Sequence, residues 1–435
     1  MPETSRFSRI TQIKPQETLN TALAFLFIFT LMASYMILRP VRDALPSDWG
    51  DVSRATQWSY TFIVSTIAVS LYNLCAAKLS LKKLVPSTFI FFAISFFAIY
   101  SAFSLGFDPA LLGKIFYVWS SVFSLFHLSV FWSYISQHHS KEQSKRLFGL
   151  INTGASAGAI AGPLIVILLV KSMELQNILL VTGIALCCVL PIIFTLNRRF
   201  ADVEHSNESQ SALNPNPFSG FAELITHKRL LGIASFIFLF SGISTFFYVT
   251  QSDLLADYSS SERKELLGSL DLITNTLTIL LGAFAANRIS RKFGLSTALS
   301  IVPFITAALL ILLSFNPATF LVLALQVLRK AGNYAITRPA REILYTGVDK
   351  EARFKTKPII DVAVYRGADV FWIWVLAFLG DGFLNLSLPA RLAIGAGVAL
   401  LWGTLGVYLG RRHENDEYQS SPNLRYSPDS AQAPN

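Results

Sequence analysis

Long apolar runs recur along the whole 435-residue chain and constrain its fold more than any other feature. A helix needs roughly 20 apolar residues to cross the hydrocarbon core of a bilayer. Only 14% of the residues are charged, whereas soluble domains carry about a quarter. The sequence therefore predicts an all-α polytopic membrane protein of about twelve spans. The candidate spans lie near residues 19–38, 57–77, 84–106, 109–135, 147–170, 176–196, 230–252, 266–286, 294–314, 318–337, 358–380 and 386–409.

A polar segment divides these spans into two groups of six. It contains the sequence Asn-Pro-Asn-Pro at residues 214–217, which is typical of a linker. The six-plus-six arrangement resembles that of major-facilitator carriers. We therefore expect two six-helix bundles and polar ends. The expected organisation is a cytoplasmic N-terminus (1–18), an N-terminal bundle (19–196), a cytoplasmic linker (197–229), a C-terminal bundle (230–410) and a disordered cytoplasmic tail (411–435).

Basic residues concentrate in alternate loops, and this bias predicts the orientation. Lys and Arg are enriched in the short cytoplasmic loops of membrane proteins. With the N-terminus inside, most of the 36 basic residues are cytoplasmic, among them Arg329 and Lys330, which we count with the loop after the tenth span. Both termini should then face the cytoplasm, and we expect the protein in the inner (plasma) membrane. Because the basic residues are spread over many segments and form no single patch, we expect no nucleic-acid partner.

The sequence contains no arrangement typical of an enzyme. There is no Gly-x-x-x-x-Gly-Lys-Ser/Thr loop, no His-Glu-x-x-His and no Gly-x-Ser-x-Gly. The cysteines, Cys75, Cys187 and Cys188, lie inside apolar runs without metal-ligand spacing. We therefore expect no catalytic residue, metal or cofactor. Transport would be driven by exchange or by an ion gradient.

One motif occurs twice, once in each half. Residues 39–45 read Arg-Pro-Val-Arg-Asp-Ala-Leu and residues 338–344 read Arg-Pro-Ala-Arg-Glu-Ile-Leu. In the predicted topology the first copy lies at the outer end and the second at the inner end, so the copies could gate opposite faces. Arg binds carboxylate and phosphate bidentately, so anion binding combined with gating is an alternative, as is interfacial anchoring. The gating candidates are Arg39, Asp43, Arg338, Arg341 and Glu342.

Ionisable residues inside the spans are further candidates, because a charge at membrane depth is costly and usually functional. The eleventh span carries Asp361, Arg366 and Asp369, with Lys357 one turn before Asp361. Arg366 and Asp369 are one turn apart and could neutralise each other. Asp271 lies in the eighth span. We assign Asp361 and Arg366 to the substrate path.

The fifth span carries glycines at four-residue spacing, Gly154, Gly158 and Gly162. Glycines at this spacing share one helix face and let another backbone approach closely. We therefore predict that this span packs tightly against a neighbouring helix.

Three segments resemble the ATP/ADP antiporter (nucleotide exchange) family of plastids and intracellular bacteria, and above all its bacterial members. They are residues 37–45 (Ile-Leu-Arg-Pro-Val-Arg-Asp-Ala-Leu), 338–346 (Arg-Pro-Ala-Arg-Glu-Ile-Leu-Tyr-Thr) and 355–367 (Lys-Thr-Lys-Pro-Ile-Ile-Asp-Val-Ala-Val-Tyr-Arg-Gly). The resemblance implies a major-facilitator-like fold and exchange transport of nucleotides.

The resemblance also implies two Lys and two Glu as functional charges in the helices. The two Lys positions fall on Arg42 and Lys357, which keep the positive charge. The two Glu positions fall on Val118 and Tyr248, so both acids are replaced. The cationic part of the family's site is therefore present and the acidic part is not.

Together these features predict a secondary active transporter, most simply an antiporter for a small anionic solute, with a nucleotide as one candidate. Its partners would be that solute and the lipid bilayer. The expected substrate-binding residues are Arg42, Lys357, Asp361 and Arg366. Three alternatives stay open: a carrier of an uncharged or cationic solute coupled to protons through Asp361 or Asp369, a lipid flippase with a lateral opening, and a non-transporting scaffold with a filled interface.

Overall fold

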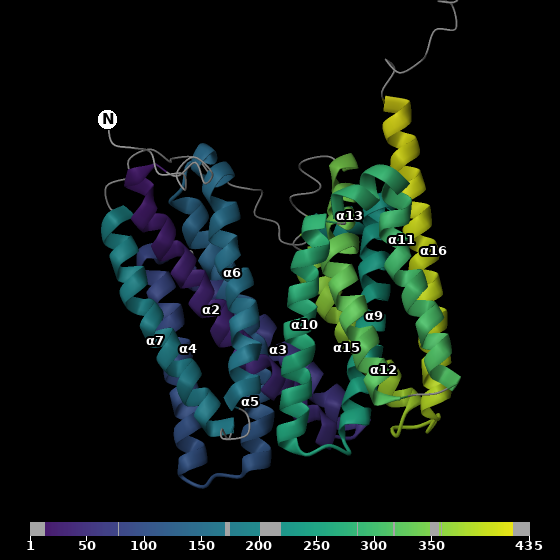
Figure 1. Cartoon of the computed structure of the whole chain (residues 1–435), viewed down its shortest axis with the longest axis horizontal. Coiled ribbons are helices and arrows are strands. Elements are labelled where there is room, and N and C mark those ends of the chain that lie inside the picture. Colours follow the sequence, from purple (N-terminus) through teal and green to yellow (C-terminus); the bar gives the residue numbers. More distant parts are fainter. Residues whose placement is uncertain are drawn as a thin grey trace, which may run out of the picture.

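The computed structural model describes residues 14–76, 78–169, 175–200, 219–284, 286–315, 318–348, 356–357 and 359–420. The helices run side by side in two groups, which lie left and right in Figure 1. The N-terminal half contains α2 (Thr18–Ala44), α3 (Asp51–Ala76), α4 (Leu81–Ser104), α5 (Pro109–Gln137), α6 (Lys141–Leu169) and α7 (Leu175–Phe200). The C-terminal half contains α9 (Lys228–Leu255), α10 (Ser260–Phe284), α11 (Ala286–Phe315), α12 (Thr319–Gly332), α13 (Arg338–Leu344), α15 (Tyr365–Leu379) and α16 (Leu388–Ser420).

Within these described residues, ten helices are long and apolar enough to cross a membrane. Helices α10 and α12 run alongside them (Figure 1), and they coincide with the eighth and tenth spans predicted from the sequence. The sequence-based prediction of an all-helical, polytopic membrane fold is therefore confirmed. We call the side where α2 begins and α16 ends the terminal side, and the opposite side the far side.

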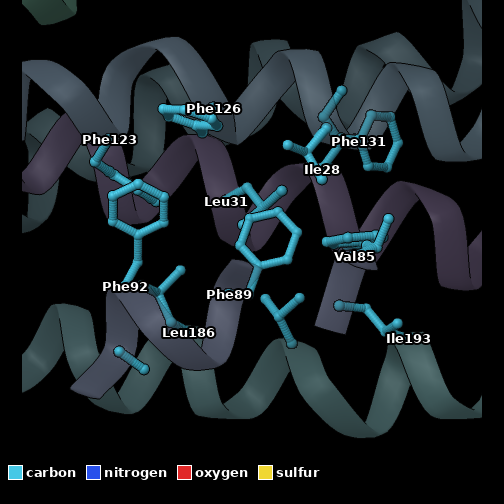
Figure 2. Close-up of a cluster of buried hydrophobic side chains, with 14 of the residues drawn as sticks. Ile28, Leu31, Val85, Phe89, Phe92, Phe123, Phe126, Phe131, Leu186 and Ile193 are labelled. Carbon is cyan, nitrogen blue, oxygen red and sulfur yellow. The ribbon is translucent and has the colours of Figure 1, made fainter. Parts of the chain in front are cut away.

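The core of the N-terminal half consists largely of aromatic rings. Phe27 packs edge-on against Phe89 and Phe131, with ring centroids 5.6 and 5.0 Å apart. Figure 2 shows side chains from α2, α4, α5 and α7 meeting in this cluster. Aromatic side chains supply a large contact area and prefer such edge-to-face arrangements. Close packing of these rings holds the four helices together where the bilayer itself gives no hydrophobic driving force.

The C-terminal half has a separate core. Trp402 of α16 is fully buried and packs against Phe236 and Phe240 of α9, with centroids 5.6 Å from each. Helices α11 and α16 approach each other closely at Gly410, where an added Cβ would lie 2.3 Å from the Cα atom of Ser296. The two halves thus have cores of their own, and smaller apolar clusters join them, where Ala55 of α3 packs with Phe246 of α9 and Ala44 of α2 packs with Leu255 of α9.

Close packing along α6 depends on its glycines. A Cβ at Gly154, Gly158 or Gly162 would lie 2.5–2.6 Å from atoms of α2, including the carbonyl oxygens of Phe25 and Phe29. Such distances are far below van der Waals contact, so no side chain fits. The predicted tight packing of this span is confirmed, and its partner is α2.

Polar contacts join the two halves in the middle and on the far side. Asn275 Nδ2 donates to the carbonyl oxygen of Ala159 at 2.8 Å. The hydroxyls of Tyr117 and Tyr248 lie 2.9 Å apart, and Trp374 Nε1 donates to Ser59 on the far side. Of these residues, Tyr117 and Tyr248 also line a polar cavity between the two halves.

Candidate functional site: a cationic cavity between the halves

The cavity has a volume of about 170 Å³ and takes its walls from both halves. Helices α2, α3 and α5 form one wall, and α9, α12 and α15 form the other. It is lined by Arg39, Arg42, Asp43, Trp58, Thr61, Phe62, Tyr117, Ser121, Ser124, Ser244, Tyr248, Gln251, Gln326, Arg329, Lys330, Tyr365, Arg366, Asp369 and Val370. Five of these side chains are basic and two are carboxylates.

The first copy of the repeated motif supplies the basic residues of the N-terminal half. Arg39, Arg42 and Asp43 are three and four residues apart, so they share one face of α2. Arg42 holds Asp43 with two contacts of 2.7 and 2.8 Å. Arg39 is looser: its Nε lies 3.6 Å from Asp43 and makes no hydrogen bond. Because charge-assisted hydrogen bonds measure about 2.7–2.9 Å, this donor is available to an anion.

Asp271 of α10 connects the two walls. Its carboxylate lies 3.6 Å from Arg39 Nε and 3.8 Å from Lys330 Nζ. The side chain is buried, and its two basic partners come from opposite halves. Asp271 therefore acts as an internal counter-ion between the halves.

Arg329 of α12 differs from the other basic residues in its partners. It is 4% exposed, and among the described residues it has no carboxylate within 4.0 Å. Its guanidinium instead donates to Gln326 Oε1 at 2.6 and 3.2 Å and lies 5.0 Å from the ring centre of Phe247. Gln326 in turn donates to Gln251 at 3.2 Å. A buried Arg held only by neutral groups is costly at membrane depth, and an anion in the cavity would lower that cost.

Helix α15 adds Arg366 and Asp369. The Asp369 carboxylate accepts a hydrogen bond of 2.5 Å from Ser241 of α9. Within the described part of the chain, no ion pair joins it to Arg366 at 4.0 Å or less. The two side chains therefore make no direct ion pair, because the Asp369 carboxylate bonds to Ser241 of α9, but Arg366 remains close enough to favour the charged carboxylate electrostatically.

The second copy of the motif forms α13 and lies away from this cavity, on the terminal side. Arg341 contacts Glu342 at 3.0 Å and Asp361 at 3.5 Å, and Lys357 Nζ contacts Glu342 at 2.5 Å. Burial disfavours the charged form of Glu342, but its bonds to Lys357 and Arg341 hold its pKa below the usual value. Arg338 is exposed. The structure thus separates Lys357 and Asp361 from Arg42 and Arg366, with which the sequence had grouped them.

Sequence reasoning missed two of the basic residues in the cavity. Arg329 and Lys330 were counted as loop charges, but they lie on α12, within a predicted span, and line the cavity. That part of the orientation count is therefore wrong. The signal was present: basic residues inside a predicted span are functional candidates by the same cost argument that selected Arg366.

An ion-pair cluster on the far side was also missed. Arg54 of α3 contacts Asp253 of α9 at 2.5 Å, and Arg391 of α16 contacts both Asp253 and Asp51, at 3.3 and 3.4 Å. Arg54 and Asp51 are buried. We call these four residues the far-side cluster. Its members are dispersed over the ends of three helices, α3, α9 and α16, so no sequence pattern could group all of them.

The two positions where the family resemblance expects acids lie differently. Tyr248 lines the cavity and bonds to Tyr117. Val118 is half-buried on α5 and is not part of the lining. The Tyr117–Tyr248 pair spans the two halves and supplies neutral hydroxyls where a carboxylate would add negative charge.

Comparison with known proteins agrees with this fold. The chain is 22% identical to ADP,ATP carrier protein 1 of Chlamydia pneumoniae over 418 residues, which is 79% of this chain and 81% of that protein. The structure of the nucleoside transporter NupG superposes with a TM-score of 0.66 at 14% identity, covering 91% of this chain and 99% of that one. A bacterial homolog of the human lysosomal transporter Spinster, in an inward-facing and unoccupied conformation, superposes with a TM-score of 0.61 at 14% identity, covering 96% and 100%.

The family itself is established by sequence. The sequence of residues 24–341, from the first membrane helix to the second copy of the repeated motif, matches that of the Major Facilitator Superfamily. The chain is therefore a multi-pass membrane protein that transports a small solute and performs no enzymatic reaction, and it belongs to the Major Facilitator Superfamily.

Proposed function

We propose that this transporter exchanges anionic solutes. The observation that supports this proposal is the charge balance of the central cavity. Five basic side chains meet two carboxylates in the lining and a third, Asp271, behind it. The described site thus keeps two positive charges in excess. Uncompensated charge at membrane depth is costly, and a substrate with about two negative charges neutralises it. A dianion such as a phosphate ester or a dicarboxylate fits this balance best.

Aromatic side chains beside the basic residues favour a substrate with a flat ring. Trp58 and Tyr248 lie with their ring centroids 5.1 Å apart in the cavity wall, and Tyr117 and Tyr365 are also in the lining. Rings of this kind stack on nucleobases. Similarity to an ADP,ATP carrier and to a nucleoside transporter supports the same direction. A nucleotide is therefore our candidate within the anionic class.

The internal counter-ion suggests how binding couples to movement. In the empty carrier, Asp271 neutralises Arg39 and Lys330 across the two halves. A substrate anion competes for the same two cations, which weakens this link as it binds. This link favours exchange over one-way transport. A carrier without substrate re-forms the contacts of Asp271 with Arg39 and Lys330, and these contacts hinder its conformational change.

The far-side cluster supports a state closed on that side. Its ion pairs join α3 to α9 and α16, and Arg263 adds a contact of 2.6 Å to Asp48. Similarity to a structure solved in an inward-facing conformation agrees with this state. In the predicted orientation, the far side is extracellular and the cavity is reached from the cytoplasm.

The test is uptake into proteoliposomes. Vesicles preloaded with unlabelled nucleotide, phosphate or a dicarboxylate, or left empty, are offered labelled monoanions, dianions, trianions and neutral nucleosides. We expect dianion uptake that requires a preloaded anion and that is unaffected by dissipating a pH gradient. Uptake of a neutral or cationic solute driven by the pH gradient alone would instead support proton-coupled transport, and transfer of labelled lipid between leaflets would support a flippase.

A further inference from the structure

The outer face of the N-terminal half carries a second, different cavity. A groove of about 340 Å³ runs between α3, α4 and α5, and it is larger than the central cavity. Ile67, Leu71 and Phe91 on its rim are 55–57% exposed, which places them towards the lipid. The lining is almost wholly apolar, with Ser87 and Thr88 among its few polar side chains.

The terminal-side end of the groove is basic. The groove ends at Leu79, in the turn between α3 and α4, and at Leu84, in the first turn of α4, and the neighbouring residues are Lys78, Lys82 and Lys83. Lys78 and Lys83 are exposed. The sequence contains no Asp or Glu at residues 52–107, so this part of α3 and the whole of α4 offer no carboxylate to Lys78 or Lys83.

We propose that this groove binds an anionic phospholipid. An acyl chain fills the apolar groove, and the headgroup phosphate lies against Lys78 and Lys83. The apolar groove lies at hydrocarbon depth and matches an acyl chain, and its basic end lies at the membrane surface and matches an anionic headgroup. A single phospholipid has both features. A zwitterionic lipid would fill the groove as well but would gain less from the lysines, because its headgroup carries no net charge.

The bound chain would lie one helix away from the substrate. Helix α5 presents Trp119, Val122 and Phe126 to the groove, and Tyr117 and Ser121 to the central cavity. Trp119 is held by a hydrogen bond of 2.6 Å to Ser95 of α4. A lipid bound in the groove would therefore contact the same helix that carries part of the substrate site. The lipid site itself depends on neither the proposed substrate nor its charge.

Lipid binding to the full chain tests this inference. Purified protein in detergent is titrated with phosphatidylglycerol or phosphatidylcholine, and bound lipid is counted by native mass spectrometry. We expect phosphatidylglycerol to bind more tightly, and each of Lys78→Gln and Lys83→Gln to weaken it about fivefold, since a lysine near the surface adds roughly that factor. Ala68→Trp, which fills the groove, should reduce binding of both lipids.

The matched control is Lys228→Gln, which removes an exposed charge on the same side but on the other half. It should leave binding unchanged. A thermal melt in phosphatidylcholine nanodiscs confirms that each variant is folded. Equal affinity for the two lipids, or an equal loss in the control, would overturn the proposal. So would full competition by millimolar inorganic phosphate, which would assign the lysines to a soluble anion.

Discussion

Arg329→Gln separates substrate binding from structural ion pairing more cleanly than any other change in the cavity. Among the described residues, Arg329 has neutral partners, Gln326 and the ring of Phe247. Removing its charge therefore leaves no carboxylate unpaired. The glutamine that replaces it keeps a polar side chain of moderate length, so the cavity wall changes little.

The expected effect on binding follows from distance and burial. Two unit charges 4 Å apart interact by about 4 kcal/mol at an effective dielectric constant of 20, and the desolvation of the anion reduces this gain. Hydrogen bonds to charged groups contribute about 1.5–3 kcal/mol net. We therefore expect anion affinity to fall at least tenfold, which is about 1.4 kcal/mol. Stability of the empty carrier should change little, because the loss of the Gln326 hydrogen bonds, about 1.5–3 kcal/mol, is offset by removal of a buried charge that has no carboxylate partner among the described residues.

Arg39→Gln is the matched comparison. It removes the same charge from the same cavity, but Asp43 and Asp271 each lose a partner. Breaking a buried ion pair costs about 3–5 kcal/mol, and we expect the lower end because Arg42 and Lys330 remain. The two variants should therefore show similar losses of affinity and different losses of stability.

The assay measures both quantities on the same samples. Anion binding is followed by isothermal titration calorimetry in detergent, and the free energy of unfolding by chemical denaturation monitored through tryptophan fluorescence. If Arg329→Gln destabilises the empty carrier as much as Arg39→Gln while anion affinity stays unchanged, Arg329 is a structural residue. The charge-balance argument for an anionic substrate then fails.

Further predictions concern packing, the closed side and orientation. Gly158→Leu should destabilise the fold by more than about 1–3 kcal/mol, because its Cβ would lie 2.5 Å from a backbone oxygen of α2. Gly149→Leu should not destabilise the fold, because a Cβ at Gly149 has no atom within 4 Å. Equal melting temperatures of the two variants would refute this prediction. Arg391→Ala should loosen the far-side cluster, and spectroscopic distances across that side should lengthen; an unchanged distribution would count against a gate. In a background without native cysteines, a cysteine at 206 should label only from the cytoplasm and one at 258 only from outside; labelling of both from one side would exclude the predicted topology.

Local sequence determined the membrane fold, because the requirement for apolar runs of sufficient length acts on each segment separately. The same holds for Gly154, Gly158 and Gly162, whose spacing alone demands a close helix neighbour. Which helix fills that place was not readable from spacing. The structure shows that it is α2.

Only part of the candidate site was predicted from the sequence, and there is a physical reason why some of its residues could be recognised and their pairing could not. Arg42 was recognised through the repeated motif and the family resemblance, and Arg366 as a charge inside its own span, and both line the cavity. The placing of Arg39 opposite Lys330, with Asp271 between them, depends on how the two halves pack. The order of residues along the chain does not show which charges pair across an interface between separate halves. The sequence by itself determined that buried charges must be compensated; only the tertiary structure decided which carboxylates do so and where two positive charges are left for a substrate.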